Sequence, residues 1–296
     1  MPVLQSPGFV PLLAATAGLF RHRRRGLDEP AAMPRVERAL AGATLSPAWL
    51  SAYQDCVGLP PDGPLPPLAL QLAAAPLHLA ILGDARFPFR ALGLVHLSQR
   101  VTQTRPLPAD AVFDLRAFTT DAQWEKRGMS FGLVTEARIG AGLVWRGETR
   151  ALAPGPSPAA AAMPAKGQRS EAAEADGPWD CEHLLRVPEP TGRRYAAIAG
   201  DLNPIHQHAL LARLFGFRRA IVHGTWTLAR ALALTGLPAT PAFSLEARFR
   251  RPVELPSTVQ VRAGPGANTG ERWVRVLGTD GRTVGLSIRI VPRGGA

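Results

Sequence analysis

Residues 195–206 read YAAIAGDLNPIH, and this stretch decides the fold and the chemistry that the sequence predicts. Within six positions it brings together the carboxylate of Asp201, the amide of Asn203 and the imidazole of His206. A carboxylate held beside a neutral imidazole is a pair that can transfer protons. The alternative interpretation is a plain turn before a capped helix, since Gly, Asp, Asn and Pro are the usual turn residues. Taken alone, the stretch favours the plain turn. A second stretch at 216–229 shifts the preference to the proton-transfer pair.

The proline of this stretch predicts where a helix begins. Pro204 fixes its own φ and moves Asn203 out of the helical region, so the helix begins at Pro204 with Asn203 as its N-cap. We expect it to continue over 205–215 and to end at Gly216. His206 would then lie in the first turn, where the positive end of the helix dipole disfavours a charged imidazole. The sequence therefore predicts a neutral His206 near pH 7.

The second stretch, GFRRAIVHGTWTLA at 216–229, leads into a helix expected over 221–236. That helix is apolar on nearly every face, so other structure must enclose it. Gly224 stands at its start, where backbone N–H groups point outward and can bind a developing oxyanion. Trp226 and the leucines after it are expected in the core.

The two stretches together, YxxIxGDxNPIH followed by GFxRxIVHGxWTLA, resemble the MaoC-like, (R)-specific hydratase/dehydratase family, also called hydratase 2. The match is dense from Tyr195 to Ala229 and loose beyond. The resemblance implies a hot-dog fold, in which an antiparallel sheet wraps a long helix, and action on acyl thioesters. It also implies catalytic roles for Asp201 and His206, a supporting role for Asn203 and a thioester oxyanion contact for the Gly224 N–H. Ala199 departs from the family pattern, where a small hydroxyl residue is common.

The two halves of the chain repeat one plan, a buried helix followed by four antiparallel strands, which predicts an α+β double hot-dog. When Tyr53–Gly58 is aligned on Tyr195–Gly200, Leu59 falls at the position of Asp201 and Pro64 at that of His206. The first half therefore lacks the acid and the base, and we expect it to complete the sheet and shape the acyl tunnel. The expected parts are an irregular leader (1–44), a non-catalytic half (45–152), a flexible Ala-, Pro- and Gly-rich linker (153–178) and the catalytic half (179–296).

Periodicity and turn residues place the individual elements. The expected helices of the first half cover 48–57 and 68–82, the second with a bend at Pro76. Strands are expected at 92–102, 111–118, 128–139 and 142–152 in the first half, and at 182–187, 243–249, from 259, 272–277 and 284–290 in the second. Asp280-Gly281 predicts a hairpin turn before the last strand.

Composition excludes some classes of protein and leaves others open. The 296 residues are 46% apolar without an apolar run long enough to span a membrane, and a basic cluster at 21–25 follows rather than precedes an apolar stretch, the wrong order for secretion. We therefore expect a cytoplasmic protein with two buried thiols, Cys56 and Cys181. The net charge of +11 is carried almost wholly by arginine and does not by itself indicate nucleic acid, since no stacking aromatics accompany the basic cluster.

Several further residues near the motif are candidates for contacts with the substrate. Arginines flank the motif and could meet the phosphates of coenzyme A or the acidic helix of an acyl carrier protein, or be ordinary surface charge. The substrate-contact candidates are Tyr195, His223, Thr225, Arg218, Arg219 and Arg250. For Tyr195 the sequence favours a core aromatic over a catalytic role, and for His223 it favours a residue that orients the loop before Gly224 over one that acts chemically.

No metal and no cofactor are expected. His206 and His208 are two residues apart and would not share a helix face, and the sequence has no other metal-ligand spacing.

The leading hypothesis is reversible hydration of 2-enoyl thioesters and dehydration of (R)-3-hydroxyacyl thioesters, with Asp201 and His206 acting through one water. A hot-dog acyl-thioesterase and a non-catalytic basic binding module are the alternatives. The expected partner is an acyl-CoA or acyl carrier protein thioester, with neither nucleic acid nor membrane. The sequence leaves open the acyl chain, the carrier, the physiological direction, the role of each catalytic group and whether the chain forms a homodimer.

Overall fold

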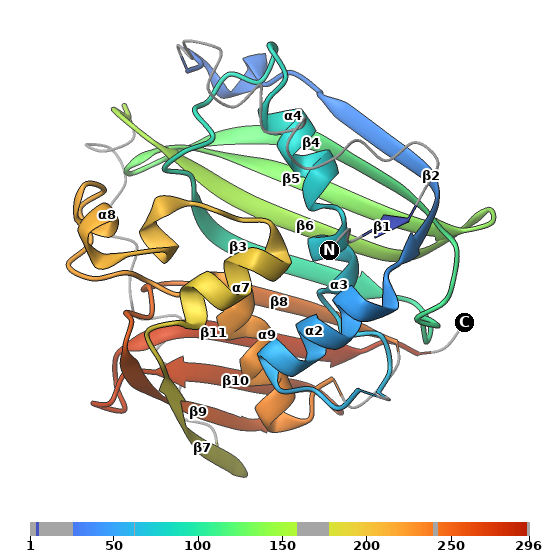
Figure 1. Ribbon diagram of the computed structural model, residues 1–296, viewed down its shortest axis with the longest axis vertical. Helices are drawn as coiled ribbons and strands as arrows, with labels where there is room; N and C mark the ends of the chain where they lie inside the picture. The colour runs from blue at the N-terminus through green and yellow to red at the C-terminus, as the bar shows by residue number, and fades with distance from the viewer. Residues whose placement is uncertain (1–3, 6–25, 62, 159–177, 239–241, 295–296) are drawn as a thin grey trace.

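The computed structural model describes residues 4–5, 26–61, 63–158, 178–238 and 242–294, which form one antiparallel sheet with helices across one of its faces (Figure 1). The sheet has eleven strands in the order β1-β2-β4-β5-β6-β3-β8-β11-β10-β9-β7. Helices α2, α3, α4, α7 and α9 lie over the face that the strands curve around (Figure 1). The repeated plan expected from the sequence is therefore present.

The first half supplies the strands on one side of the sheet. Its elements are β1 (Leu4–Gln5), η1 (Pro30–Ala32), β2 (Glu37–Leu45), α2 (Pro47–Val57), α3 (Ala69–Ala73), α4 (Ala75–Leu82), β3 (Val95–Gln103), β4 (Phe113–Glu125), β5 (Gly128–Ile139) and β6 (Gly142–Pro154). The four strands β3 to β6 lie where alternation predicted them. The expected helix at 68–82 is two helices, broken at Ala74, because Pro76 can enter only the first turn of α4.

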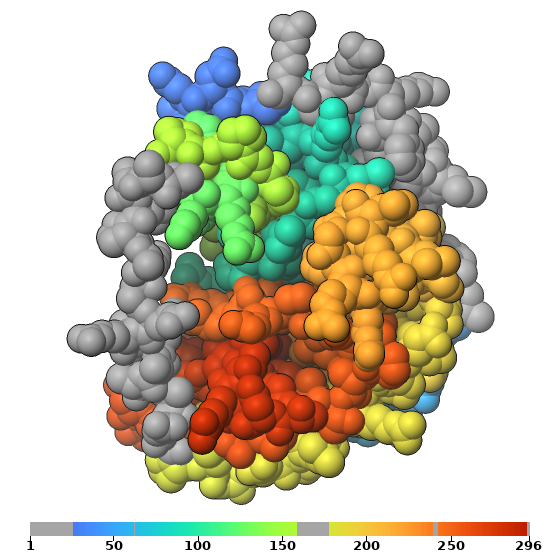
Figure 2. Space-filling view, turned by 90° about the vertical axis from the view of Figure 1, so that its left-hand side faces the viewer, coloured from blue at the N-terminus to red at the C-terminus, as the bar shows by residue number. Residues whose placement is uncertain are grey.

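The second half supplies the other side, and its yellow-to-red surface lies mostly below the green and teal surface of the first half in Figure 2. Its elements are β7 (Cys181–Val187), α7 (Thr191–Ala199), η2 (Pro204–His206), α8 (Ala209–Arg213), α9 (Gly224–Thr235), β8 (Phe243–Phe249), β9 (Ser257–Pro265), β10 (Arg272–Leu277) and β11 (Val284–Pro292). Helix α9 packs on β9, β10 and β11 and is the enclosed apolar helix that the sequence predicts. Asp280-Gly281 forms the turn between β10 and β11.

The two halves meet at the middle of the sheet, where β3 pairs with β8. Six residue pairs join these strands, from Ser98 opposite Arg248 to Gln103 opposite Phe243. Outward from this seam the strand order β3-β6-β5-β4-β2 of the first half matches the order β8-β11-β10-β9-β7 of the second. Each of these ten strands thus has a counterpart, with β1 as an extra edge strand, and the chain is a two-fold repeat held in one continuous sheet.

The helices α2 and α7 are counterparts as well, and they pack against each other. Each ends at a glycine with a φ of 71°, Gly58 and Gly200, a left-handed conformation that other residues adopt at a cost. The rings of Tyr53 and Tyr195, five residues before these glycines, lie 6.5 Å apart. The sequence register that aligns Tyr53 with Tyr195 is therefore matched by the geometry.

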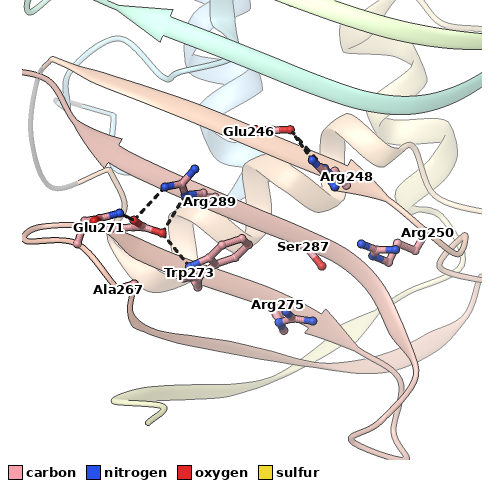
Figure 3. A pocket seen from close by; sticks show the side chains of 10 residues that line it. Glu246, Arg248, Arg250, Ala267, Glu271, Trp273, Arg275, Ser287 and Arg289 are labelled. Carbon is pink, nitrogen blue, oxygen red and sulfur yellow. Dashed lines mark hydrogen bonds and ion pairs between the residues drawn. The ribbon is translucent and has the colours of Figure 1, made fainter. Parts of the chain in front are cut away.

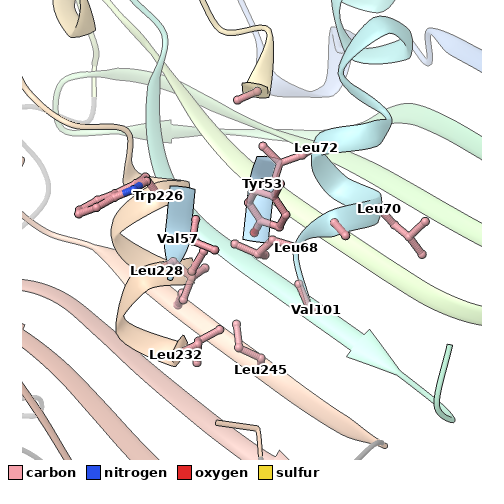
Figure 4. Packing of buried hydrophobic residues seen from close by; sticks show 14 of the residues in the cluster. Tyr53, Val57, Leu68, Leu70, Leu72, Val101, Trp226, Leu228, Leu232 and Leu245 are labelled. Carbon is pink, nitrogen blue, oxygen red and sulfur yellow. The ribbon is translucent and has the colours of Figure 1, made fainter. Parts of the chain in front are cut away.

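One hydrophobic core runs through both halves. Figure 4 shows Leu228 and Leu232 of α9 beside Val101 of β3 and Leu245 of β8, across the seam. Tryptophan side chains add hydrogen bonds between the halves: Trp49 Nε1 donates to the carbonyl of Ile198 (3.0 Å), and Trp226 Nε1 to that of Cys56 (3.1 Å). Because buried polar groups are costly without partners, these bonds hold the helices of one half against the other.

Three local expectations differ from the structure. Residues 37–44 of the expected irregular leader belong to β2, which pairs with β4 and is the counterpart of β7. Helix α7, which carries Tyr195, was not expected. The helix expected over 205–215 is broken, because His208 is extended (φ −152°, ψ 143°) and its Nδ1 accepts from the Leu210 N–H to begin α8.

Other expectations fall partly outside the described residues. The basic cluster at 21–25 lies outside them, and so does the linker from 159 to 177. Both cysteines are free thiols, but Cys56 and Cys181 are half-buried rather than buried, because each lies near the end of its element. Among the described residues, no helix has both the length and the apolar character that a membrane span requires.

Candidate active site

The motif loop begins where α7 ends. The left-handed Gly200 turns the chain away from the helix, and the loop then folds around its own polar side chains. Asp201 Oδ1 accepts from the Asn203 N–H (3.1 Å), and Asn203 Oδ1 accepts from the Ile205 N–H (3.4 Å). Asn203 is therefore the N-cap that the sequence predicts, although the helix it caps is the single 3-10 turn η2. Its structural role is to hold the loop between Asp201 and His206.

His206 is the buried end of this loop, with 8% of its surface exposed. Its Nδ1 lies 2.8 Å from the carbonyl oxygen of Ile221, and because a carbonyl only accepts, Nδ1 carries the hydrogen. Nε2 therefore presents its lone pair, 3.9 Å from Asp201 Oδ2. Burial lowers the pKa of His206 below its ordinary value of 6.5, against the opposing effect of Asp201. The neutral state is thus due to desolvation rather than to the helix dipole that the sequence suggested, since η2 is only one turn long.

His223 supports both members of the pair. Its ring stacks on that of His206, with centroids 3.7 Å apart, and its Nε2 donates to the backbone carbonyl of Asp201 (3.1 Å). Burial, and then the neighbouring His206, lower the pKa of His223 to about 4, so this imidazole is neutral as well. Tyr195 lies behind it, with ring centroids 5.1 Å apart. His223 therefore orients the loop, as one of the two sequence interpretations proposed.

Gly224 is the first residue of α9 and lies beside the histidines. The N–H groups in the first turn of a helix have no partner within it and can bind an oxyanion. A Cβ atom on Gly224 would meet the ring of Phe249 at 2.9 Å, closer than such contacts occur. The helix can therefore approach β8 this closely only with glycine at its start.

These groups line one cavity of about 250 Å³, here called the active-site cavity. Asp201, Asn203, His206, Gly224 and Thr225 come from the second half. The first half contributes Leu94, Val95 and His96 at the start of β3, and the His96 ring lies 4.5 Å from that of Phe249. The cavity therefore has walls from both halves, while Asp201 and His206 both come from the second.

The structure brings together most, but not all, of the residues proposed from the sequence. Thr225 and Arg250 line the cavity with the catalytic candidates. Tyr195 is fully buried behind His223 and does not line it. Arg218 and Arg219 are exposed on the segment between α8 and Ile221, outside the cavity.

His96 and Phe249 were missed by the sequence reasoning. Phe249 was expected only as the last residue of the strand at 243–249, and His96 stands in a strand with no motif around it. What places them at the site is the pairing of β3 with β8, which the alternation of either strand does not specify.

The site also contains a group of side chains that resembles a metal site. Ligand atoms of Asp201, His206 and His223 lie within 4.8 Å of one another, whereas His208, the other histidine weighed from the sequence, caps α8 instead. The Nε2 of His223 donates its hydrogen to a carbonyl and so offers no lone pair there. That leaves two ligand atoms, one from Asp201 and one from His206, fewer than the three protein ligands usual at a catalytic zinc.

Comparison with known proteins agrees with the geometry. Residues 171–279 match the family model described as "MaoC like domain". The chain is 30% identical over 272 residues to "3-hydroxyacyl-thioester dehydratase X" of Mycobacterium tuberculosis, a match that covers 88% of this chain and 90% of the relative.

Solved structures agree on the fold. A crystal structure of HtdX from M. tuberculosis is 25% identical, with a TM-score of 0.73 over 87% of this chain and all of the other. A MaoC-like dehydratase from Phytophthora capsici is 17% identical, with a TM-score of 0.69 over 90% and 98% of the two chains. An M. tuberculosis protein described as a double hotdog fold is 16% identical, with a TM-score of 0.52 over 88% and 98%. The chain has the double hot-dog fold and belongs to the MaoC-like dehydratase family, and it is therefore a hydro-lyase.

Proposed function

We propose that the enzyme dehydrates (R)-3-hydroxyacyl thioesters and, in reverse, hydrates 2-enoyl thioesters, with Asp201 and His206 acting through one water. The observation that carries the proposal is the gap of 3.9 Å between His206 Nε2 and Asp201 Oδ2. This distance is too long for a direct hydrogen bond and suits one bridging oxygen atom. The name of the M. tuberculosis relative, a 3-hydroxyacyl-thioester dehydratase, supports the same substrate class.

In the hydration direction the roles depend on the tautomer of His206. Its Nε2 lone pair takes a proton from the water while the hydroxide oxygen bonds to C3 of the enoyl group. The C2=C3 π bond becomes an enolate, and the proton returns from the site to C2. Asp201 orients the same water and balances the transient imidazolium. Because both new bonds come from one side, the addition is syn.

The negative charge of the enolate collects on the thioester oxygen, and Gly224 suits that charge. Its N–H stands at the start of a helix of twelve residues, whose positive end favours an anion. Preorganised donors of this kind are worth more in a site sheltered from water. The second half therefore holds the whole reaction, and the first half provides a wall for the substrate.

The test is turnover of crotonyl-CoA and longer 2-enoyl-CoA thioesters, measured as loss of the enoyl absorbance, with acyl carrier protein thioesters in parallel. We expect loss of absorbance and formation of the (R)-3-hydroxyacyl product. Saturated acyl thioesters serve as the control: release of free thiol from them, without enoyl turnover, would instead indicate the thioesterase. No turnover with either carrier at any chain length contradicts the proposal.

The pH dependence of kcat/KM reflects the burial of His206. The free base is the active form, so activity is full above the pKa of His206 and declines as the pH falls through it. Since burial lowers this pKa, the acid limb of the profile should lie below 6.5. The measurement is the hydration rate at low substrate concentration in buffers of constant ionic strength. It covers about pH 4 to about pH 8, a range of about two units on either side of the ordinary histidine pKa. An acid limb above 6.5 would contradict the assignment of His206 as the base.

A further inference from the structure

A second cavity lies on the outer face of the sheet, opposite the helices, in the second half. We call it the arginine pocket: it has a volume of about 420 Å³ and is lined by side chains of β8, β10 and β11 (Figure 3). These side chains point outward because their neighbours along each strand, such as Ala247, Val274 and Ile288, are buried in the core. The proposed proton transfers make no use of this pocket.

Its lining is unusually cationic. Four arginines, Arg248, Arg250, Arg275 and Arg289, face two carboxylates, Glu246 and Glu271. Both carboxylates already have arginine partners: Glu246 lies 3.1 Å from Arg248, and Glu271 lies 2.8 Å from Arg289. The pocket therefore carries a formal excess of two positive charges, which an anionic ligand would balance.

Buried groups face the middle of the pocket. Arg275 is only 3% exposed and Ser287 only 5%, and both are directed toward the space beside Arg250 (Figure 3). The hydroxyl oxygen of Ser287 has no hydrogen-bond partner within the part of the chain that the structure describes. A buried hydroxyl without a partner costs free energy, so a ligand oxygen there would satisfy it.

The corresponding place in the first half provides an internal comparison. A pocket of about 300 Å³ lies there on the same face of the sheet, lined by three arginines (Arg100, Arg146 and Arg150) and three carboxylates (Asp121, Glu148 and Glu246). Each of these arginines lies within 4 Å of one of these carboxylates. Glu246 lines both pockets, so the first-half pocket has an excess of at most one positive charge and the arginine pocket has the larger excess.

The arginine pocket is joined to the active site through Arg250, which lines both cavities. Arg250 follows Phe249, the residue packed against Gly224, at the point where β8 ends. A chain leaving the active-site cavity at this rim would pass Arg250 and reach Arg248, Arg275 and Ser287 within about four strand residues, or roughly 13 Å. This reach suits a substrate that carries its negative charge at a distance from its thioester.

From these observations we infer that the arginine pocket binds phosphoryl groups, and that they are the phosphates of the coenzyme A that carries the acyl group. Arginine binds phosphate oxygens in pairs through its planar fork, and the Ser287 hydroxyl adds a donor. The ring of Trp273, held by a hydrogen bond from its Nε1 to Glu271 (3.0 Å), gives the nucleotide base a fixed surface in the same pocket. This inference rests on the proposed function for the identity of the thioester.

The test compares two crotonyl thioesters, one of coenzyme A and one of N-acetylcysteamine, which has no phosphate. In Arg275→Gln and in Ser287→Ala we expect the KM for crotonyl-CoA to rise, at least tenfold for Arg275→Gln, while the ratio of kcat/KM for the two thioesters shifts toward the phosphate-free one. Arg150→Gln, which removes a charge paired with Asp121 on the same sheet face in the other half, is the matched control and should leave that ratio unchanged. Thermal melting verifies that each variant is folded.

Binding of adenosine 3′,5′-bisphosphate, measured by titration calorimetry, separates the outcomes. Loss of this binding in Arg275→Gln, together with the raised KM, supports the inference. Loss of bisphosphate binding with an unchanged KM for crotonyl-CoA assigns the pocket to a free anion. That result would contradict the inference that the pocket binds the phosphates of coenzyme A. Unchanged binding and unchanged KM in both variants overturn the site itself. If no thioester is turned over, the proposed function fails, while loss of bisphosphate binding would still establish the phosphoryl site.

Discussion

Replacing Asp201 by Asn should lower kcat for enoyl-thioester hydration by at least ~10², as the loss of a positioned proton-transfer group does. Asn keeps the shape of the side chain and can still accept the 3.1 Å hydrogen bond from the Asn203 N–H, so the loop should retain its conformation. The side chain is half exposed and adds little to the core. We therefore expect a folded, nearly inactive enzyme, measured as single-turnover hydration of crotonyl-CoA alongside the melting temperature.

His206→Ala should have an effect of the same size, and the double variant should be little worse than either single one. Both side chains serve one water, and groups that act as a unit are not additive. The controls lie in the first half. Asp55→Asn changes an exposed carboxylate 3.7 Å from Arg194, and His78→Ala removes a ring of α4 that is hydrogen-bonded to Thr135 of β5.

Neither control should alter kcat, although His78→Ala will lower stability because it removes a half-buried ring and its hydrogen bond to Thr135. Near wild-type rates for both second-half variants, or loss of turnover in Asp55→Asn, would refute the confinement of the chemistry to one half.

Gly224→Ala should reduce kcat by ~10² to 10³, the usual range for loss of one oxyanion donor. The new Cβ would stand 2.9 Å from two ring carbons of Phe249, so the start of α9 must shift and its N–H must move with it. The effect should fall mainly on kcat, because charge on the thioester oxygen develops in the transition state. Steady-state kinetics with crotonyl-CoA measure it.

A second substitution tests the steric cause. Phe249→Leu removes the ring carbons that the new methyl group meets, so the double variant Gly224→Ala/Phe249→Leu should be faster than Gly224→Ala alone. A wild-type rate for Gly224→Ala would show that this N–H does not contribute. A folded double variant no faster than Gly224→Ala would show that the ring is not the obstacle.

Much of this architecture could be predicted because strands with one buried face alternate in sequence. Phe243, Leu245 and Ala247 do so plainly, and they lie in the core as expected. The sequence did not predict strand β2, because its residues do not alternate between apolar and polar. Its central residues, Ala39 to Gly42, are small or only partly buried, and its place depends on pairing with β4. Pairing between distant segments leaves little trace in either one.

In the site, too, local features could be predicted from the sequence and long-range contacts could not. The proximity of Asp201 and His206 is a consequence of a short loop, and the motif predicts it. The route by which His206 becomes neutral is not predictable in this way, because burial depends on α9 and on the carbonyl of Ile221, fifteen residues away. Helix propensity likewise suggested one helix over 205–215, whereas the side chain of His208 offers the backbone a competing cap.

The seam between β3 and β8 joins two halves that are no longer identical, and this changes what a single substitution does. In a symmetric dimer of one hot-dog each mutation occurs twice, once beside the acid and base and once on the wall that faces them. Here Leu94, Val95 and His96 occur once, on the wall only. Their size can change to admit a different acyl group while the proton-transfer pair keeps its surroundings, so specificity and reactivity can be adjusted separately within one polypeptide.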